Sequence, residues 1–243
     1  MSLSNQADRS KAIIQWDDLK DRINEYGKDC QFVKPRDGLP DMVFTANAGV
    51  VLPDKRVIVS NFKCPERKGE EEWFVQHFAE AGFEVIYPSH PFEGAGDCLF
   101  WEAGKRIAVC GHGFRSDLAV YSEIGPMFGC DLLLVKLVDP RFYHLDTCFC
   151  PLDGGCLIYP KAFDEESLAS IRSVGGFEIE VPEDEAKRFA CNAVEIDKTV
   201  ILPAGCPVTE GKLKDVGFKT VPVEMGEFIK AGGACKCLTL ALD

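Results

Sequence analysis

The sequence predicts an α/β protein, a propeller of five ββαβ units with pseudo-fivefold symmetry. Three observations predict it. Apolar, β-rich segments recur, and most are divided by a short polar or glycine turn, as β-hairpins are. Four of these hairpins are followed by a helix candidate and then by one more apolar strand. The equivalent positions Asn47, Cys98, Cys148, Asn192 and Cys237 recur at intervals of roughly 45 to 50 residues, a period typical of repeat architectures.

The repeated elements follow in chain order. The segments that open the units are "DMVFTANAGVVLPDKRVIVS", "GAGDCLFWEAGKRIAVCG", "HLDTCFCPLDGGCLIYP", "FACNAVEIDKTVILP" and "GGACKCLTLAL". The helix candidates are "GEEEWFVQHFAEAG", "SDLAVYSEIGPMFG", "FDEESLASIRSVGG" and "CPVTEGKLKDVGF", with Ser116 and Asp164 as expected N-caps of the second and third. The strands expected after these helices are "FEVIYP", "CDLLLVKLV", "FEIEVP" and "FKTVPV".

The two ends of the chain are expected to form the fifth unit together. We expect a helix from about Ala7 to Tyr26, a strand from about Gln31 to Lys34, and a last strand that starts at Cys237. Joining the ends closes the ring, so that residues from all units meet in one pocket. The prediction is one catalytic domain, 1–243, with units at about 41–88, 89–139, 140–182 and 183–224, and a fifth from 225–243 plus 1–40.

Composition excludes several functions. The chain has 243 residues, of which 46% are hydrophobic, enough for a sizeable core. The net charge of −12 argues against nucleic acid as a partner. No apolar run has membrane-spanning length, and the N-terminus lacks a secretory-signal pattern. We therefore expect a cytoplasmic protein without a membrane partner. The sequence leaves the oligomeric state open, a homo-oligomer included.

Twelve cysteines in such a chain are expected to be free thiols, most of them packed as small hydrophobic side chains. Zinc ribbons need paired C-x-x-C spacing, which is missing here, so we expect neither a metal nor a cofactor. Cys148 with Cys150, and Cys235 with Cys237, are C-x-C pairs. A four-thiolate site made from both pairs stays open as an alternative.

Polar and reactive residues stand at the opening of every unit. In chain order they are Asp41 and Asn47, Glu93 and Asp97, His144 and Asp146, Asn192, and Cys237. Converging carboxylates suit a planar guanidinium, which they bind through forked, charge-assisted hydrogen bonds. A bound cation or a histidine can activate a cysteine nucleophile. Arg115, just before a helix candidate, can bind a substrate carboxylate. The alternative is that these are ordinary turn residues at strand ends.

These motifs resemble the guanidino-group-modifying superfamily, or pentein fold, over nearly the whole chain. "HLDTCF" is similar to its His-x-Asp motif, "FEGAGDCLF" to its Glu-Gly-Gly-Asp segment, and "KAGGACKCLTL" to its terminal cysteine segment. The resemblance implies Cys237 as nucleophile, His144 as general acid and base, and Glu93 and Asp146 as guanidinium holders. It implies a covalent thiouronium intermediate. The remaining unit-opening residues and Arg115 are assigned to substrate binding: Asn47, Asp97, Arg115, Asp41 and Asn192.

Asn47 favours one branch of this superfamily, the arginine dihydrolases. Arginine deiminases carry an acid in the segment written here "DMVFTANAG", whereas the arginine dihydrolase branch is similar to this chain. That branch converts arginine to ornithine, carbon dioxide and ammonia. Dimethylarginine dimethylaminohydrolase, arginine deiminase and a non-catalytic arginine-binding relative stay as alternatives. Related dihydrolases have a further strand before the first helix, so we expect an incomplete fifth unit here.

Overall fold

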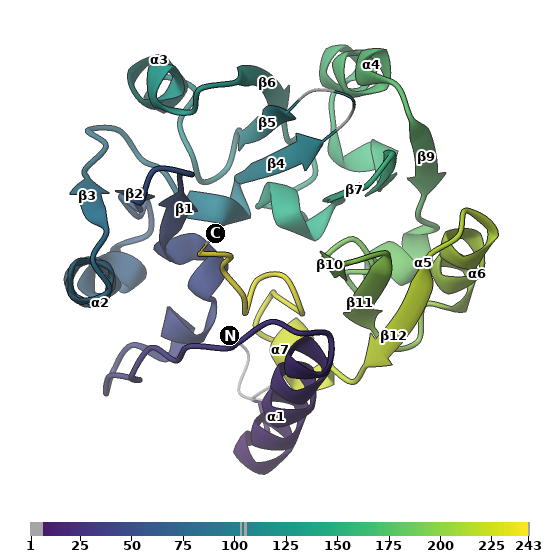
Figure 1. Ribbon diagram of the computed structural model, residues 1–243, viewed down its shortest axis with the longest axis horizontal. Coiled ribbons are helices and arrows are strands. Elements are labelled where there is room, and N and C mark those ends of the chain that lie inside the picture. Colours follow the sequence, from purple (N-terminus) through teal and green to yellow (C-terminus); the bar gives the residue numbers. More distant parts are fainter. Residues whose placement is uncertain (1–6, 103, 105, 243) are drawn as a thin grey trace.

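Four three-stranded sheets stand around a common centre, with helices on their outer sides (Figure 1). The computed structural model describes residues 7–102, 104 and 106–242. The sheets are built from β1 Gly49–Val51, β2 Arg56–Val59 and β3 Glu84–Ile86; β4 Cys98–Glu102, β5 Arg106–His112 and β6 Asp131–Lys136; β7 Phe149–Leu152, β8 Gly155–Ile158 and β9 Phe177–Glu180; and β10 Val194–Ile196, β11 Thr199–Pro203 and β12 Lys219–Val223. The mixed α/β class and four of the five predicted sheets are thereby confirmed.

Each sheet has the same topology. The first two strands form the predicted hairpin, and the third strand returns parallel to the second. Parallel strands need a crossover, and a helix lies in each one. These helices are α2 Glu71–Glu80, α3 Val120–Ile124, α4 Glu165–Val174 and α6 Pro207–Asp215. The chain also forms α5 Glu183–Ala186 and the 3₁₀ helices η2 Pro40–Val43, η3 Thr45–Ala48, η4 Pro65–Glu70, η5 Gly94–Gly96, η6 Gly125–Met127, η7 Leu145–Thr147 and η8 Pro160–Ala162.

One of the two predicted helix caps is correct. The Asp164 side chain accepts a hydrogen bond from the backbone N–H of Ser167 and caps α4. Ser116 is not a cap, because α3 begins four residues later and the Ser116 hydroxyl instead donates to Asp97. Local sequence identified the polar residue but not its partner, which lies in another turn.

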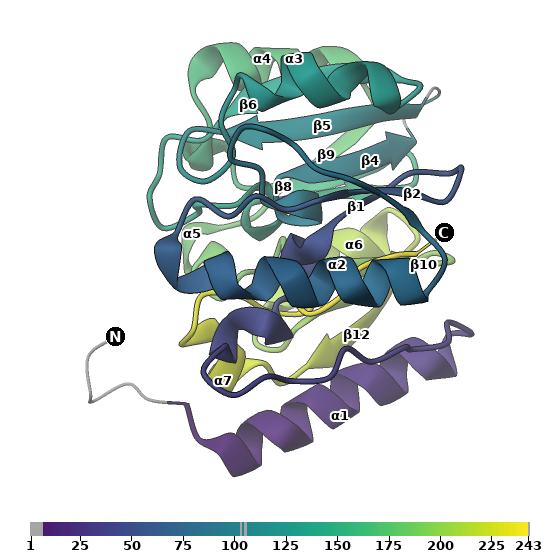
Figure 2. The ribbon, with the colours of Figure 1, turned by 90° about the vertical axis from the view of Figure 1, so that its left-hand side faces the viewer.

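The fifth position of the ring holds helices and no sheet among the described residues. The predicted first helix is present as α1 Arg9–Glu25, and it packs against α7 Gly226–Ile229 and β12. Figure 2 shows α1 lying along this side of the molecule. Leu19 and Ile23 are its buried apolar residues, and Asp8 N–H donates to the Glu227 carboxylate at 2.7 Å.

Two strand predictions for this fifth position are wrong. Residues 31–34 form no strand, and they are largely exposed. The segment that begins at Cys237 is not a strand either, because residues 235–238 form a turn closed by Leu238 N–H on the Ala234 carbonyl. The Asn192 side-chain oxygen also accepts the backbone N–H groups of Ala234 and Cys237, at 3.0 Å each. A side chain therefore takes the place that a neighbouring strand would have.

The largest apolar cluster runs through the later sheets to the turn that holds Cys237, and two smaller clusters fill the first two units. Most of the cysteines are buried in these clusters, as predicted, and all twelve are free. Within the described ranges, no helix combines the length and the apolar character needed to cross a lipid bilayer.

Candidate active site

Short turns before the first strand of each sheet bring the predicted residues together. Asn47 lies in η3, Asp97 directly follows η5, and Asp146 lies in η7. Glu93 and His144 are the residues immediately before η5 and η7. All five side chains are buried, although they are up to 99 residues apart in the sequence. Burial of so many polar groups is tolerated only where they contact one another.

Cys237 lies beside a carboxylate and an amide. Its thiol donates to Asp146 Oδ2 at 3.2 Å and accepts a hydrogen bond from Asn192 Nδ2 at 3.0 Å. Burial and the neighbouring carboxylate of Asp146 raise the pKa of Cys237 well above its usual value. The other oxygen, Asp146 Oδ1, is buried and has no hydrogen-bond partner among the described residues. Burial also raises the pKa of Asp146, in opposition to the charges of His144 and Lys236. The Asp146 carboxylate can therefore accept one more hydrogen bond.

His144 forms the second part of the site with Glu93. The His144 Nε2 atom is 2.6 Å from Glu93 Oε2. Burial opposes protonation of His144, but the hydrogen bond and the charge of Glu93 outweigh it and raise the pKa of His144. Burial alone favours a neutral Glu93, yet His144 and Arg115 lower the pKa of Glu93 to about 2. These shifts favour an imidazolium paired with a carboxylate.

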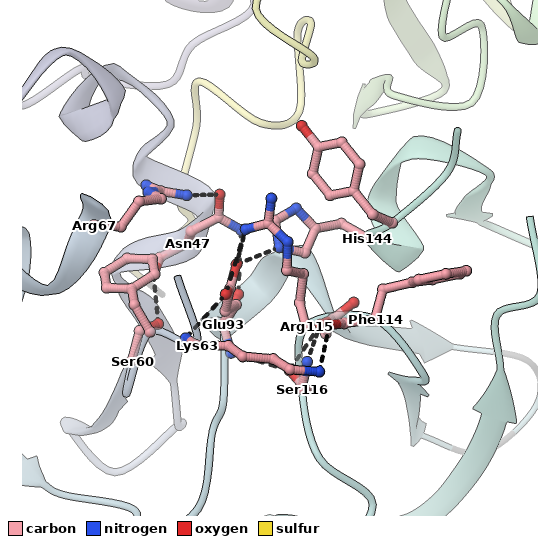
Figure 3. Close-up of polar contacts among 12 residues, drawn as sticks. Asn47, Ser60, Lys63, Arg67, Glu93, Phe114, Arg115, Ser116 and His144 are labelled. Atoms are coloured by element: carbon pink, nitrogen blue, oxygen red, sulfur yellow. Dashed lines mark hydrogen bonds and ion pairs between the residues drawn. The ribbon is translucent and has the colours of Figure 1, made fainter. Parts of the chain in front are cut away.

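Arg115 pairs with Glu93, one of the two residues expected to bind a substrate guanidinium. Its Nη1 atom is 3.1 Å from Glu93 Oε2 and 3.4 Å from Oε1, and Figure 3 shows Arg115 and His144 reaching Glu93 together. The guanidinium carbon also lies 4.5 Å from the centre of the Tyr143 ring, within cation–π range. Tyr143 in turn donates to the Gly232 carbonyl at 3.0 Å. A protein guanidinium therefore lies between a carboxylate and an aromatic ring beside the site.

Asp97 has a different place from the one predicted. Its Oδ1 accepts the N–H of Leu145 at 3.1 Å, and its Oδ2 accepts the N–H and the hydroxyl of Ser116 at 3.1 and 2.7 Å. Burial raises the pKa of Asp97 to about 6. Leu145 follows His144 and Ser116 follows Arg115 in the chain, so these three hydrogen bonds fix the backbone beside both residues. The carboxylate of Asp97 therefore does not line the cavity.

The cavity that these residues surround is small, with a volume of about 40 Å³. It is lined by Asp41, Phe44, Asn47, Arg67, Arg115, Tyr143, His144, Ala231, Gly232 and Cys237. Five of the predicted site residues are among them, whereas Glu93, Asp97, Asp146 and Asn192 support the lining from behind. Asp41 contributes its half-buried side chain to the wall, and its carbonyl accepts a bond from Arg67 at 3.1 Å.

Arg67 was missed by sequence reasoning. It forms a buried, bidentate ion pair with Glu70, at 2.9 and 2.7 Å, and its Nη1 donates to Asn47 Oδ1 at 2.8 Å. The Nδ2 of Asn47 donates to the Glu93 carbonyl at 3.2 Å, so both ends of the amide are held (Figure 3). Arg67 lies in the charged run "PERKGEEE", which is indistinguishable from an exposed helix start, and no local signal marks it.

Metal binding has no support in the described part of the chain, where no three His, Cys, Asp or Glu side chains are grouped as metal ligands would be. The four-thiolate alternative is not assembled. What is assembled is a buried thiol, an imidazole and carboxylates around one cavity. This defines the class: an α/β protein with a buried site that combines a thiol, a histidine and carboxylates.

Comparison with known proteins agrees with this class. The family model described as "N,N dimethylarginine dimethylhydrolase, eukaryotic" matches residues 1–242. N(G),N(G)-dimethylarginine dimethylaminohydrolase of Mycobacterium tuberculosis is 35% identical over all of this chain and 79% of its own length. The chain therefore belongs to the dimethylarginine dimethylaminohydrolase family. This confirms the resemblance to the guanidino-group-modifying superfamily, in which that family was one of the relatives.

Arginine dihydrolases are also similar. The bifunctional arginine dihydrolase/ornithine cyclodeaminase ArgZ of Synechocystis is 44% identical over 97% of this chain. The match spans 34% of ArgZ, about a third of its length. The solved N-terminal domain of ArgZ, an arginine dihydrolase bound to product, superposes with a TM-score of 0.94 at 43% identity, covering 98% of this chain and 88% of that one.

Proposed function

We propose that the chain is a cysteine hydrolase that cleaves the guanidinium C–N bonds of arginine, and that it acts as an arginine dihydrolase. One observation carries the proposal: the Cys237 thiol and the His144 imidazolium line the same buried cavity, each with a carboxylate partner. A small-molecule guanidino compound is the proposed ligand.

Substrate binding is expected to exchange one guanidinium for another. The cavity of about 40 Å³ holds no more than about one water molecule, so arginine enters only if Arg115 moves. When Arg115 leaves Glu93, the substrate guanidinium takes its place between Glu93 and Asp146. The free oxygen of Asp146 then gains the donor that it lacks. The displaced Arg115, together with Arg67, can bind the substrate carboxylate.

The cation then activates the nucleophile. Burial and Asp146 favour the protonated form of Cys237. A guanidinium placed beside the sulfur favours the thiolate and lowers its pKa. The thiolate attacks the guanidinium carbon, and His144 gives its proton to the departing nitrogen, which leaves as ammonia. His144 then accepts a proton from water, which attacks the thiouronium carbon and releases citrulline and the thiolate.

Asn47 supports a second round of hydrolysis. Its amide is uncharged and is held between Arg67 and the Glu93 carbonyl. An amide at this position tolerates a neutral ureido group, whereas a carboxylate binds a cation better. The citrulline formed first can thus stay and be attacked again, giving ornithine, carbon dioxide and ammonia. Structures of ArgZ as an arginine dihydrolase bound to product support this assignment.

Product analysis by mass spectrometry tests the proposal. Purified protein incubated with arginine is expected to release ornithine and ammonia. Accumulation of citrulline without ornithine would contradict the second hydrolysis. An Asn47→Asp variant is expected to shift products toward citrulline, whereas Asn61→Asp, on the half-buried Asn61 outside the cavity, is expected to leave the ratio unchanged.

Dimethylarginine hydrolysis is the second candidate, because the family model that matches is that of dimethylarginine hydrolases. Turnover of dimethylarginine to citrulline, with no turnover of arginine, would establish it. Arginine deiminase activity would give citrulline alone from arginine. Binding of either compound without turnover would identify a non-catalytic relative.

We also propose that the whole chain is one catalytic domain. In this arrangement the helices α1 and α7, with residues 225–243 and 1–40, complete a pseudo-fivefold ring with the four sheets. The spacing of the unit openings and the convergence of their turns support it.

A further inference from the structure

A second and much larger cavity lies behind the active site. Its volume is about 820 Å³, and one layer of unit-opening turns separates it from the catalytic cavity. Neighbouring residues of the chain face opposite sides of this layer. Asn47 lines the catalytic cavity and Ala48 the large one, and likewise Cys237 lines the first while Lys236 and Leu238 line the second. The nucleophile and the large cavity are thus one residue apart.

The inner wall of the large cavity is apolar. Ligand sites usually have volumes between roughly 300 and 1,000 Å³ and are mainly apolar with a few placed polar groups. This cavity fits that description. Buried residues on its wall include Val50, Phe74, Phe78, Leu99, Phe149 and Leu238. Arginine, which is polar and cationic, is a poor match for such a wall.

Lys236 supplies a cation on this wall. Its Nζ contacts the Thr239 carbonyl at 3.3 Å, and no carboxylate among the described residues forms an ion pair with it. Lys20 and Glu195 also line the cavity, but Lys20 pairs with Asp17 at 2.9 Å and Glu195 accepts the N–H of Asp153 at 2.8 Å. The other charged side chains on the wall are exposed. Burial lowers the pKa of Lys236, in opposition to Asp146 and Cys237, which raise it.

We propose that this cavity binds a monocarboxylate with an unbranched apolar chain, whose carboxylate pairs with Lys236 and whose chain lies along the apolar wall. A half-buried ammonium without an anionic partner is stabilised by a carboxylate, and the wall around it is stabilised by an apolar chain. The site differs in ligand chemistry from the proposed arginine site.

Occupancy of this site is expected to affect Cys237. Lys236 directly precedes Cys237 in the chain, although its side chain lines the other cavity. Its positive charge favours the Cys237 thiolate, because the two charges are opposite. A carboxylate paired with Lys236 cancels part of that effect. The ligand would therefore make the thiolate harder to form and slow reactions at the sulfur.

Titration calorimetry with octanoate tests the binding site directly. Octanoate is expected to bind, and octanol and octylammonium, with the same chain length, are expected to bind far more weakly. Lys236→Met is expected to weaken octanoate binding about tenfold or more, because it removes a charge-assisted hydrogen bond. Lys219→Met, on an exposed lysine of β12 outside the cavity, is the matched control and should bind as the unchanged protein does.

Val194→Phe provides a second variant, should Lys236→Met fail to fold. Val194 is half-buried on the cavity wall, and a phenyl ring there takes part of the volume. Octanoate is expected to bind this variant more weakly than the unchanged protein, while the affinity for butanoate changes less. Equal octanoate affinity of Lys236→Met and the unchanged protein would overturn the proposal. So would displacement of octanoate by arginine, or capture of an extended apolar peptide in place of the carboxylate.

Alkylation of Cys237 by iodoacetamide gives a readout that does not need arginine turnover. Saturating octanoate is expected to slow alkylation about threefold or more, since a smaller fraction of the thiol is ionised. The effect should be absent in Lys236→Met. An unchanged rate of alkylation with octanoate bound would show that the large cavity is not coupled to Cys237. Neither measurement depends on which guanidino compound is hydrolysed, so the two proposals fail independently.

Discussion

At the scale of single residues, the buried pair of His144 and Glu93 has a pH dependence that follows from its pKa shifts. The pKa of Glu93 falls from 4.5 to about 2 on folding, so its contribution to stability is complete above about pH 4.5 and is lost as pH falls toward 2. The pKa of His144 is raised above 6.5, so its contribution is complete below that pH and is lost above its folded value. Both contributions are therefore present together between about pH 4.5 and 6.5.

We predict that Glu93→Gln lowers the free energy of unfolding most in this window, by about 3 kcal/mol, an order-of-magnitude figure from the shift of Glu93. Urea unfolding from pH 2 to 8 measures it. The deficit should shrink as pH approaches 2, where the original carboxylate is also protonated. Glu84→Gln, on an exposed position of β3, is the control. A deficit independent of pH would show that the pair is not charged.

A second prediction concerns the two cysteines of the terminal turn. Cys237 touches Asp146 and Asn192, whereas Cys235 is fully buried in the apolar cluster, where burial raises the pKa of its thiol. Cys237→Ser should abolish any adduct of the protein with arginine trapped in acid and detected by mass spectrometry. Cys235→Ala should retain the adduct and most activity. An adduct that survives Cys237→Ser would assign the nucleophile elsewhere.

At the scale of elements, the closeness of the turns depends on glycine. The 3₁₀ helices η3 and η5 pack together at the centre, and a Cβ on Gly96 would lie 2.1 Å from Asn47 Nδ2 and 3.4 Å from the His144 ring. The first distance is far below contact. A side chain at position 96 would therefore displace the Asn47 amide from its place.

We predict that Gly96→Ala displaces the Asn47 amide and lowers kcat at least about tenfold, with a loss of stability of about 1 to 3 kcal/mol from overpacking. Product ratios and urea unfolding measure the two effects. Gly211→Ala in α6 is the matched control, because a Cβ there meets nothing within 4 Å, and it should be neutral or slightly stabilising. Equal effects of both changes would show that Gly96 has no particular role.

The elements also show what sequence could and could not predict. Hairpins and crossover helices depend on periodicity and local turn chemistry, so four units were predicted with their order. The turn around Cys237 depends on the Asn192 side chain, 45 residues away, and was predicted as a strand. In the site, the positions at the start of each unit predicted most of the residues that come together. Arg67 was not predicted, because it contacts Asn47 and Glu70 from a segment with no distinctive sequence pattern.

At the scale of the whole molecule, the ligand is expected to connect parts of the ring that are far apart in sequence. The cavity beside Cys237 is lined by residues from Asp41 to Cys237. A ligand that contacts several units stabilises the folded chain by mass action, by about 2.7 kcal/mol at a concentration of 100 Kd.

We predict that arginine raises the melting temperature of Cys237→Ala, which lacks the proposed nucleophile, by several degrees (about 2–4 °C per kcal/mol for a chain of this size). Lysine, which has the same backbone and charge but no guanidinium, should raise it much less. Thermal-shift assays measure both. Equal shifts for the two amino acids would argue against recognition of the guanidinium.

The contact of Arg115 with Glu93 has a practical consequence for such experiments. If an internal guanidinium occupies the holder until substrate displaces it, free guanidinium ion is a competitor for the same carboxylate. Guanidinium chloride would then act on this protein as a weak ligand at low concentration and as a denaturant at high concentration. Unfolding curves in guanidinium chloride and in urea are expected to extrapolate to different stabilities, and Glu93→Gln should bring them together.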